Sequence, residues 1–186
     1  KLAAQTEGAR EIVFSAVANM DAAEEGDEEA KEVLRLLTPI IKFTTARSSV
    51  QAALETMEVL GGNGYIEDFV TPRLLRDAQV LPIWEGTTNI QVLDVLRTLR
   101  KEQPLLITVD RFKRRLEGIE NRKYLEPTIH RTEHEMQELI DQVKAFDELP
   151  EDHVTLSTRP WAERFGSILT TSLLLEAADR QLTTTG

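Results

Sequence analysis

One carboxylate, Glu85, stands between an apolar run and the expected start of a helix. Residues 81–84 before it are Leu, Pro, Ile and Trp, and helical periodicity resumes near Thr87. A carboxylate is favoured at the positive end of a helix, and this structural explanation is the more frequent one. In a partly dry pocket the same carboxylate would hold a proton more tightly and act as a base. The residues alone leave both interpretations open.

A glycine-rich loop is the second candidate for chemistry. Gly61, Gly62 and Gly64 have no side chains, so a phosphate or a ring could approach the backbone N–H groups closely. The loop follows a helical pattern, whereas the dinucleotide-binding fingerprint requires a preceding strand. A helix cap with a tight turn is the alternative, and it is the commoner use of such glycines.

The elements that must position these residues are all expected to be helical. Apolar residues recur at spacings of three and four in every long segment, and strand-like alternation is absent. The acidic stretch 23–27, the glycines at 61 and 62, and Pro72 and Pro82 interrupt the pattern. The predicted fold class is therefore all-α, in two packed helical layers or bundles. The predicted helices are 2–22, 29–60 with a kink at Pro39, 73–80, a helix from about 87, 105–121, 127–147 and 158–181.

Pro104 marks a further boundary, which predicts a helical domain at 1–103 and an additional helical domain at 104–186. The chain opens on Lys1 and not on Met, so we expect a fragment of a longer protein.

Composition narrows the class of protein. With 186 residues and 41% hydrophobic residues the chain has enough apolar material for a core, which disfavours wholesale disorder. The absence of cysteine excludes disulfides, thiol catalysis and Cys-ligated zinc. A net charge of −10 disfavours broad binding to nucleic acid. No apolar run is long enough to span a bilayer and no signal peptide is evident, so a cytoplasmic protein is predicted.

Three sequence elements occur in a fixed order. They are Gly-Gly-Asn-Gly-Tyr at 61–65, Arg-Asp-Ala at 76–78, and Ile-Trp-Glu-Gly-Thr-Thr-Asn-Ile-Gln at 83–91. This order resembles the C-terminal signature of the acyl-CoA dehydrogenases, and the resemblance covers about residues 1–101. Thr38-Pro39, Trp84 and the run at 93–97 are similar to the AidB-like, alkylation-response branch. That branch carries an extra C-terminal helical extension, which would account for residues 104–186.

The resemblance implies roles for individual residues. Glu85 matches the glutamate that removes the α-proton of a fatty acyl-CoA while the β-hydrogen leaves as hydride to FAD. Gly86 matches a position beside the substrate thioester, and Trp84 would line the flavin or acyl site, with a core aromatic as the equally weighted alternative. Five residues match those that contact FAD of the adjoining subunit: Glu58, Val59, Leu60, Gly61 and Gly62. At the first of these positions the family usually has a glutamine. Three more match residues that meet FAD just after the base: Thr87, Thr88 and Asn89.

The resemblance also implies partners. They are an acyl-CoA substrate, further copies of the chain in a dimer of dimers, and an electron-transfer flavoprotein as the acceptor. Because the family's other domains supply most flavin contacts, the 186-residue piece alone is expected to bind FAD weakly or not at all and to have no turnover. Two alternative functions remain: an alkylation-response flavoprotein that binds nucleic acid with only incidental dehydrogenation, and a helical self-association module.

Two further patterns are interpreted structurally. His130 and His134 match a zinc-peptidase motif, but they lie in a segment crowded with charged residues and are predicted to face solvent. The basic cluster 111–115 is interleaved with Asp110, Glu117 and Glu120, and Glu102 lies nearby; it is predicted to be an ion-paired helix surface and not a DNA-binding one.

Overall fold

The computed structural model describes residues 1–101 and 103–185, and within them the secondary structure is helical without any strand. The predicted all-α fold is therefore confirmed. The elements are α1 Leu2–Glu24, α2 Glu28–Leu60, α3 Gly62–Tyr65, α4 Thr71–Val80, α5 Thr88–Leu99, α6 Gln103–Glu117, α7 Arg122–Lys144, the 3-10 helix Ala145–Glu148, and α8 Glu151–Thr185.

The break between α1 and α2 forms where the acidic stretch predicted it. Gly26 has φ +102°, a left-handed conformation that glycine adopts without strain. The side chain of Asp27 then accepts a hydrogen bond from the backbone N–H of Ala30 at 3.0 Å and caps α2. At the other end Gly61, with φ +58°, closes the helix.

Two helix starts differ from the prediction. α7 begins at Arg122 and not at 127, and α8 begins at Glu151 and not at 158, so Pro127 and Pro160 lie inside helices. An interior proline costs a helical hydrogen bond, but the turns before these prolines bury apolar groups that hold them helical: Leu125 packs against the core and Val154 is buried. His153 consequently lies in the first turn of α8.

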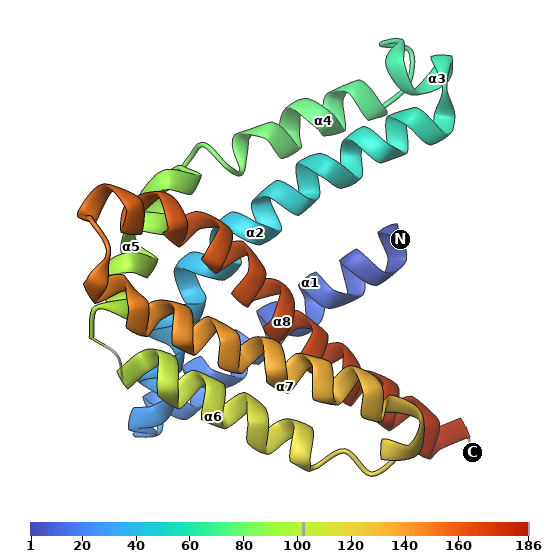
Figure 1. Ribbon diagram of the computed structural model, residues 1–186. Helices are drawn as coiled ribbons and strands as arrows, with labels where there is room; N and C mark the ends of the chain where they lie inside the picture. Colours follow the sequence, from blue (N-terminus) through green and yellow to red (C-terminus); the bar gives the residue numbers. More distant parts are fainter. Residues whose placement is uncertain (102, 186) are drawn as a thin grey trace.

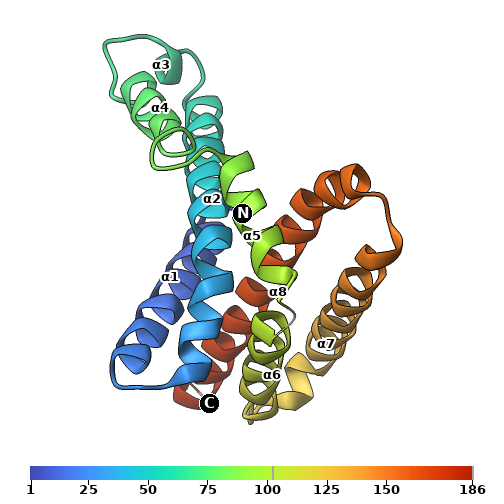
Figure 2. The same cartoon turned by 90° about the vertical axis from the view of Figure 1, so that its left-hand side faces the viewer.

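The C-terminal half of α2 and the antiparallel helix α4, joined through α3, form an arm that extends away from the rest of the molecule (Figure 1). The view turned by 90° shows the same arm standing clear of α6, α7 and α8 (Figure 2). The N-terminal half of α2 instead lies among the other helices. α2 is therefore the element that connects the arm to the body of the protein.

The hydrophobic core is continuous between residues before 104 and residues after it. Phe43 of α2, Phe112 of α6 and Phe165 of α8 are fully buried in one cluster. A Cβ on Gly166 would lie 2.9 Å from Cγ2 of Ile40, so α8 packs closely on α2. The division at 103/104 stays a prediction about independent units, because packing alone does not show how each part folds.

Ion pairs join α6 to the start of α2 and to α8. Arg111 contacts Asp27 at 3.0 Å, Arg114 contacts Glu29 at 2.8 Å, and Arg115 binds the Glu176 carboxylate through two nitrogens at 2.6 and 2.7 Å. The three arginines of the basic cluster are thus ion-paired, as predicted for this surface, whereas no ion pair of Lys113 is found among the described residues. The expected partners were mostly wrong, because the partners lie on neighbouring helices; among the described residues only Asp110, 3.0 Å from Arg114, comes from the same helix. Glu102, named among the expected partners, lies outside the described residues.

None of the helices in residues 1–101 and 103–185 combines the length and the apolar character that crossing a membrane requires.

Candidate active site

Glu85 lies in the turn that joins α4 to α5. It is the one non-glycine residue with positive φ, at +53°, among the residues that the structure describes, and Gly86 follows with φ +101°. A left-handed conformation costs a residue with a side chain about 1 kcal/mol or more. The surroundings of the turn must therefore hold Glu85 in place.

The main contact comes from Lys42 of α2. Its Nζ donates to the backbone carbonyl oxygens of Leu81, Trp84 and Gly86 at 3.1, 2.9 and 2.6 Å. Nε2 of Gln91 on α5 also donates to the carbonyl of Glu85, at 3.2 Å. A Cβ at residue 86 would lie 2.5 Å from the same Nε2, so the glycine leaves room for this contact. The turn is therefore tied to two helices.

The side chain of Glu85 is exposed in this chain, and large apolar side chains near it in sequence are exposed as well. Ile83 and Trp84 are 58% and 52% exposed, and Ile90 of α5 is 55% exposed. Trp84 is thus not buried in the core of the described chain, against the core-aromatic alternative. Apolar surface of this kind around a polar group is typical of a ligand site or a contact with another part of a protein.

The start of α5 offers backbone donors that have no acceptor within the helix. Thr87 is the N-cap and makes no side-chain hydrogen bond to the helix. The first intrahelical bond joins the N–H of Gln91 to the carbonyl of Thr87 at 3.1 Å, so the N–H groups of Thr88 and Asn89 have no partner within the helix. Such a helix start favours an anion, including a phosphate.

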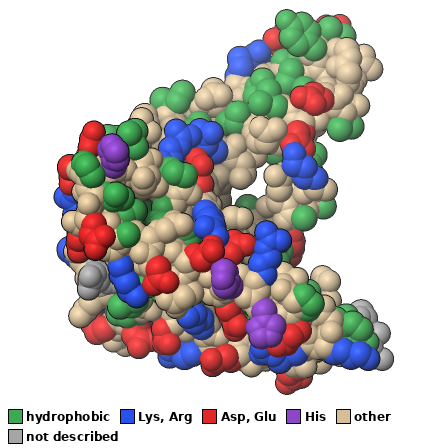
Figure 3. All heavy atoms as spheres, viewed as in Figure 1, with side chains coloured by type: hydrophobic (Ala, Val, Ile, Leu, Met, Phe, Trp, Pro, Cys, Tyr) green, Lys and Arg blue, Asp and Glu red, His purple; other side chains and the backbone are tan. Residues whose placement is uncertain are grey.

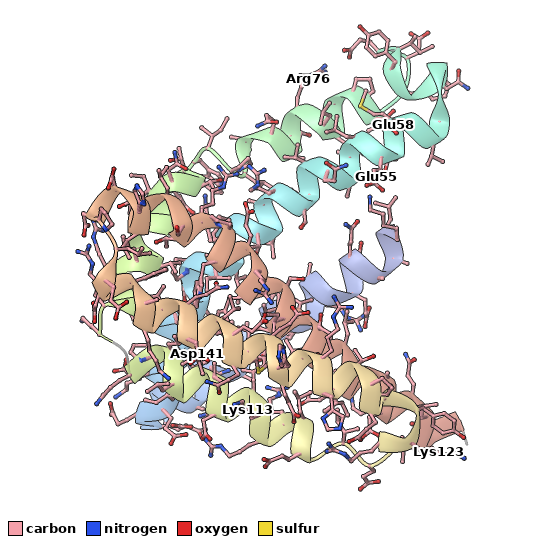
Figure 4. The ribbon with its side chains drawn as sticks, viewed as in Figure 1. Glu55, Glu58, Arg76, Lys113, Lys123 and Asp141 are labelled. Carbon is pink, nitrogen blue, oxygen red and sulfur yellow. The ribbon has the colours of Figure 1, made fainter. Side chains whose placement is uncertain are left out.

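The other candidate cofactor residues lie at the far end of the arm. Figure 4 places Glu58 near the tip, on α2, and Val59 and Leu60 are 80% and 47% exposed. Hydrophobic side chains also lie along the arm in Figure 3. From Lys42 to Leu60 the helix rises about 27 Å, at 1.5 Å per residue. One chain therefore presents two separate candidate surfaces, at residues 58–62 and at residues 84–89.

The three glycines of the tip loop serve different purposes. Gly61 closes α2 with positive φ, as the cap interpretation predicts. Gly64 is buried, and a Cβ there would lie 2.3 Å from the carbonyl oxygen of Met57, so this glycine allows α3 to contact the backbone of α2. A Cβ at Gly61 or Gly62 would meet no atom within 4 Å, so these two positions leave space beside the backbone.

Arg76 of the Arg-Asp-Ala element also lies on the arm (Figure 4). It binds both carboxylate oxygens of Glu67, at 2.8 and 3.2 Å. This hydrogen bonding lowers the pKa of Glu67 and raises the pKa of Arg76. Arg76 therefore connects α4 to the segment after α3.

A bidentate ion pair fixes α5 to α2 near the Glu85 turn. Arg35 donates to both oxygens of Asp94 at 2.6 and 2.7 Å. Arg35 and Lys42 are seven residues apart, two helical turns, so they share one side of α2. The Arg35 hydrogen bond, followed by its charge, lowers the pKa of Asp94 against the opposing effect of desolvation.

This shift predicts a pH dependence of stability. Because the folded pKa of Asp94 lies below its unfolded value of about 3.9, the pair stabilises the fold at pH above that value and the contribution is lost as pH falls through the folded pKa. We expect Asp94→Asn to lower the thermal unfolding midpoint at pH 7, with the difference from wild type shrinking below about pH 4. Thermal unfolding of both proteins at pH 7, 5, 4 and 3 measures this difference in midpoint. A difference that stays constant over this range would contradict a stabilising role of the ionised Asp94 side chain.

Lys42 was overlooked in the sequence. It is the one charged residue between positions 36 and 46, in a run of apolar residues and threonines with Pro39. A lysine in such a run requires polar partners, because burying an unpaired ammonium is costly. That feature marks the position, but the sequence does not say which carbonyls it meets.

The histidine pair lies elsewhere, on α7. The side chains of His130 and His134 are 68% and 74% exposed, with carboxylate oxygens of Glu126 and Glu138 at 3.0 and 3.7 Å. This is the solvent-facing helix surface that the sequence predicted. Within the described residues, no group of three or more His, Asp or Glu side chains is arranged to hold a metal ion.

Comparisons with known proteins match the first part of the chain to a family. The family model described as acyl-CoA dehydrogenase, C-terminal domain, matches residues 1–100. Acyl-CoA dehydrogenase family member 11 of Caenorhabditis elegans is 40% identical over 121 residues, which are 64% of this chain and 19% of that protein. The putative acyl-CoA dehydrogenase AidB of Escherichia coli is 42% identical over 104 residues, which are 55% of this chain and 18% of that protein.

Solved structures extend the likeness past residue 100. The crystal structure of Caenorhabditis elegans ACDH-11 in complex with C11-CoA has a TM-score of 0.86 at 32% identity, over 95% of this chain and 31% of that one. The apo form of Bd2924 has a TM-score of 0.75 at 31% identity, over 95% of this chain and 32% of that one. The chain thus spans about a fifth of those two curated relatives and about a third of these solved chains.

Proposed function

We propose, because this chain belongs to the acyl-CoA dehydrogenase family, that its full-length protein oxidises an acyl-CoA thioester between the α and β carbons. In this proposal Glu85 is the base that takes the α-proton. The observation that supports it is the turn itself: a carboxylate held at φ +53°, with the backbone on either side tied to α2, next to exposed apolar residues.

The chemistry explains why such a turn is needed. An α-proton beside a thioester is only weakly acidic, so its removal requires a base held at the reacting carbon. The carboxylate of Glu85 receives the proton and becomes neutral. Apolar neighbours such as Trp84 would exclude water, and this strengthens the carboxylate as a base. Gly86, with no side chain, would leave space for the thioester.

FAD, when bound, supplies the acceptor for the hydride that leaves the β-carbon. The residues of this chain fit such a group. The N–H groups of Thr88 and Asn89, which have no acceptor within α5, suit an anionic part of the cofactor. The open space beside the backbone at Gly61 and Gly62 would let a second FAD molecule come close to it. Because these glycines lie far from the Glu85 turn along the arm, we assign the set Glu58–Gly62 to the FAD of an adjoining subunit. An oligomer, with an electron-transfer flavoprotein as acceptor, is part of the proposal.

The nucleic-acid alternative is not favoured. Binding to phosphates requires positive charge that is not already neutralised. Arg111, Arg114 and Arg115 each have a carboxylate within 3.0 Å. The chain is similar to AidB, but the arginines of this cluster do not form an uncompensated basic surface.

The test uses the full-length protein, purified with its flavin and mixed anaerobically with acyl-CoAs of different chain length and branching. We expect at least one acyl-CoA to bleach the oxidised flavin absorbance and to yield the 2-enoyl-CoA in equal amount. The 186-residue chain purified alone is expected to carry no stoichiometric flavin. A flavin that no acyl-CoA reduces would argue against dehydrogenation.

A further inference from the structure

We propose that Lys42 is a positioning residue for the base, an inference that rests on the proposed function of Glu85. Lys42 sets the direction of the carboxylate by holding the backbone on both sides of it. It does so from α2, a helix about 40 residues earlier in the chain than the Glu85 turn.

The arrangement of the three hydrogen bonds supports this role. Two of the acceptors, the carbonyls of Trp84 and Gly86, belong to the residues on either side of Glu85, and the third, that of Leu81, belongs to the start of the turn. An ammonium has three N–H donors, so each donor has an acceptor in the turn. The peptide units around Glu85 are therefore fixed relative to α2.

The hydrogen bonds of the Lys42 ammonium all go to the Glu85 turn within the described residues. Its side chain is half-buried, and among the described residues no carboxylate lies within ion-pair distance of its nitrogen. The other lysine of α2, Lys31, is exposed and pairs with Glu28 one turn away. A charged hydrogen bond to a carbonyl is stronger than a neutral one, so three of them are well suited to hold a strained turn.

The consequence for the reaction is geometric. Without the ammonium, the left-handed conformation of Glu85 would lose its main restraint and the turn would relax. A displacement of about 1 Å at a reacting group lowers the rate by about 100-fold. Loss of Lys42 should therefore reduce kcat much more than it changes KM or flavin content.

The experiment compares variants of the flavin-loaded, full-length protein. Lys42→Met keeps the length of the side chain without its donors, Lys42→Arg keeps the charge, and Lys31→Met is the matched control on the same helix. We expect Lys42→Met to lower kcat by about 100-fold, with KM and flavin content within threefold of wild type. Lys42→Arg should recover at least tenfold of that loss, and Lys31→Met should match wild type.

Two measurements do not depend on turnover. Amide hydrogen exchange followed by mass spectrometry should accelerate in the peptide covering 81–91 of Lys42→Met, and not in the peptide covering 57–66. With an acyl-CoA whose β-carbon is replaced by sulfur, dehydrogenation is blocked, and NMR in D2O follows α-proton exchange alone. Lys42→Met should slow that exchange as much as it slows turnover.

Outcomes separate the two proposals. If Glu85→Gln is inactive while Lys42→Met keeps kcat within threefold, the positioning role is wrong and Glu85 remains the base. If Lys42→Met loses flavin or stability but keeps kcat per bound flavin, Lys42 is only structural and the inference is overturned. If Lys42→Met does not fold, Lys42→Gln, which keeps two donors, is compared instead, and the same thresholds apply. If Glu85→Gln stays active, the proposed function fails, and with it the inference.

Discussion

Glu85→Gln in the full-length protein is expected to lower kcat for acyl-CoA oxidation by about 10³-fold or more. A glutamine has nearly the size of glutamate but does not accept a proton at physiological pH, so general-base catalysis, which contributes about 10²–10⁴-fold, is lost. The side chain is exposed in this chain and forms no ion pair among the described residues. The fold and the flavin content should therefore be unchanged.

Anaerobic stopped-flow measurement of flavin absorbance gives the rate in a single turnover. Glu25→Gln, the same chemical change in the exposed turn before α2, is the matched control and should react at the wild-type rate. A rate for Glu85→Gln within tenfold of wild type would show that another group removes the α-proton.

Phe165→Ala is expected to destabilise the protein by about 3–5 kcal/mol, the usual range for removing a fully buried phenylalanine. Phe165 is fully buried, and its ring stacks on Trp161 with centroids 4.8 Å apart. Trp161 is held in turn by the bond from its Nε1 to the carbonyl of Leu139 at 3.0 Å. The cavity would thus open at the contact between α8 and its neighbours.

Chemical denaturation followed by tryptophan fluorescence measures the loss, with Leu156→Ala as the control because that leucine is on the same helix and 75% exposed. Hydrogen exchange shows where protection is lost. Because the core is shared, we expect faster exchange in α2 residues 30–46 as well as in α8. Faster exchange confined to residues 104–186 would instead support two independent domains, as the sequence predicted.

The sequence predicted the fold well where local features decide it. The start and end of α2 follow from Asp27 and Gly61, which act within a few residues of themselves. The starts of α7 and α8 were missed because burial of residues such as Val154 outweighs the local effect of Pro160. That balance depends on packing between distant segments.

In the candidate site, too, the sequence predicts what neighbouring residues determine and not what the packing of distant segments determines. Glu85 was identified from a motif of neighbouring residues, and the structure adds its backbone conformation. Lys42 was not identified, because its partners lie about 40 residues away along the chain and meet it only through the packing of α4 and α5 on α2. A single sequence contains no record of that pairing.

α2, its cap Asp27 and the glycines that follow it carry three sets of contacts or candidate contacts. Asp27 and Glu29 pair with arginines of α6, Lys42 and Arg35 bind the Glu85 turn and α5, and residues 58–62 lie at the tip. Each residue added to a helix turns everything beyond it by about 100° and shifts it by about 1.5 Å. Substitutions between these sets would alter local packing only. A single insertion or deletion between Lys42 and the tip would instead rotate one candidate cofactor surface relative to the other. Protein engineering of this chain must therefore preserve the length of this helix more than the identity of its exposed residues.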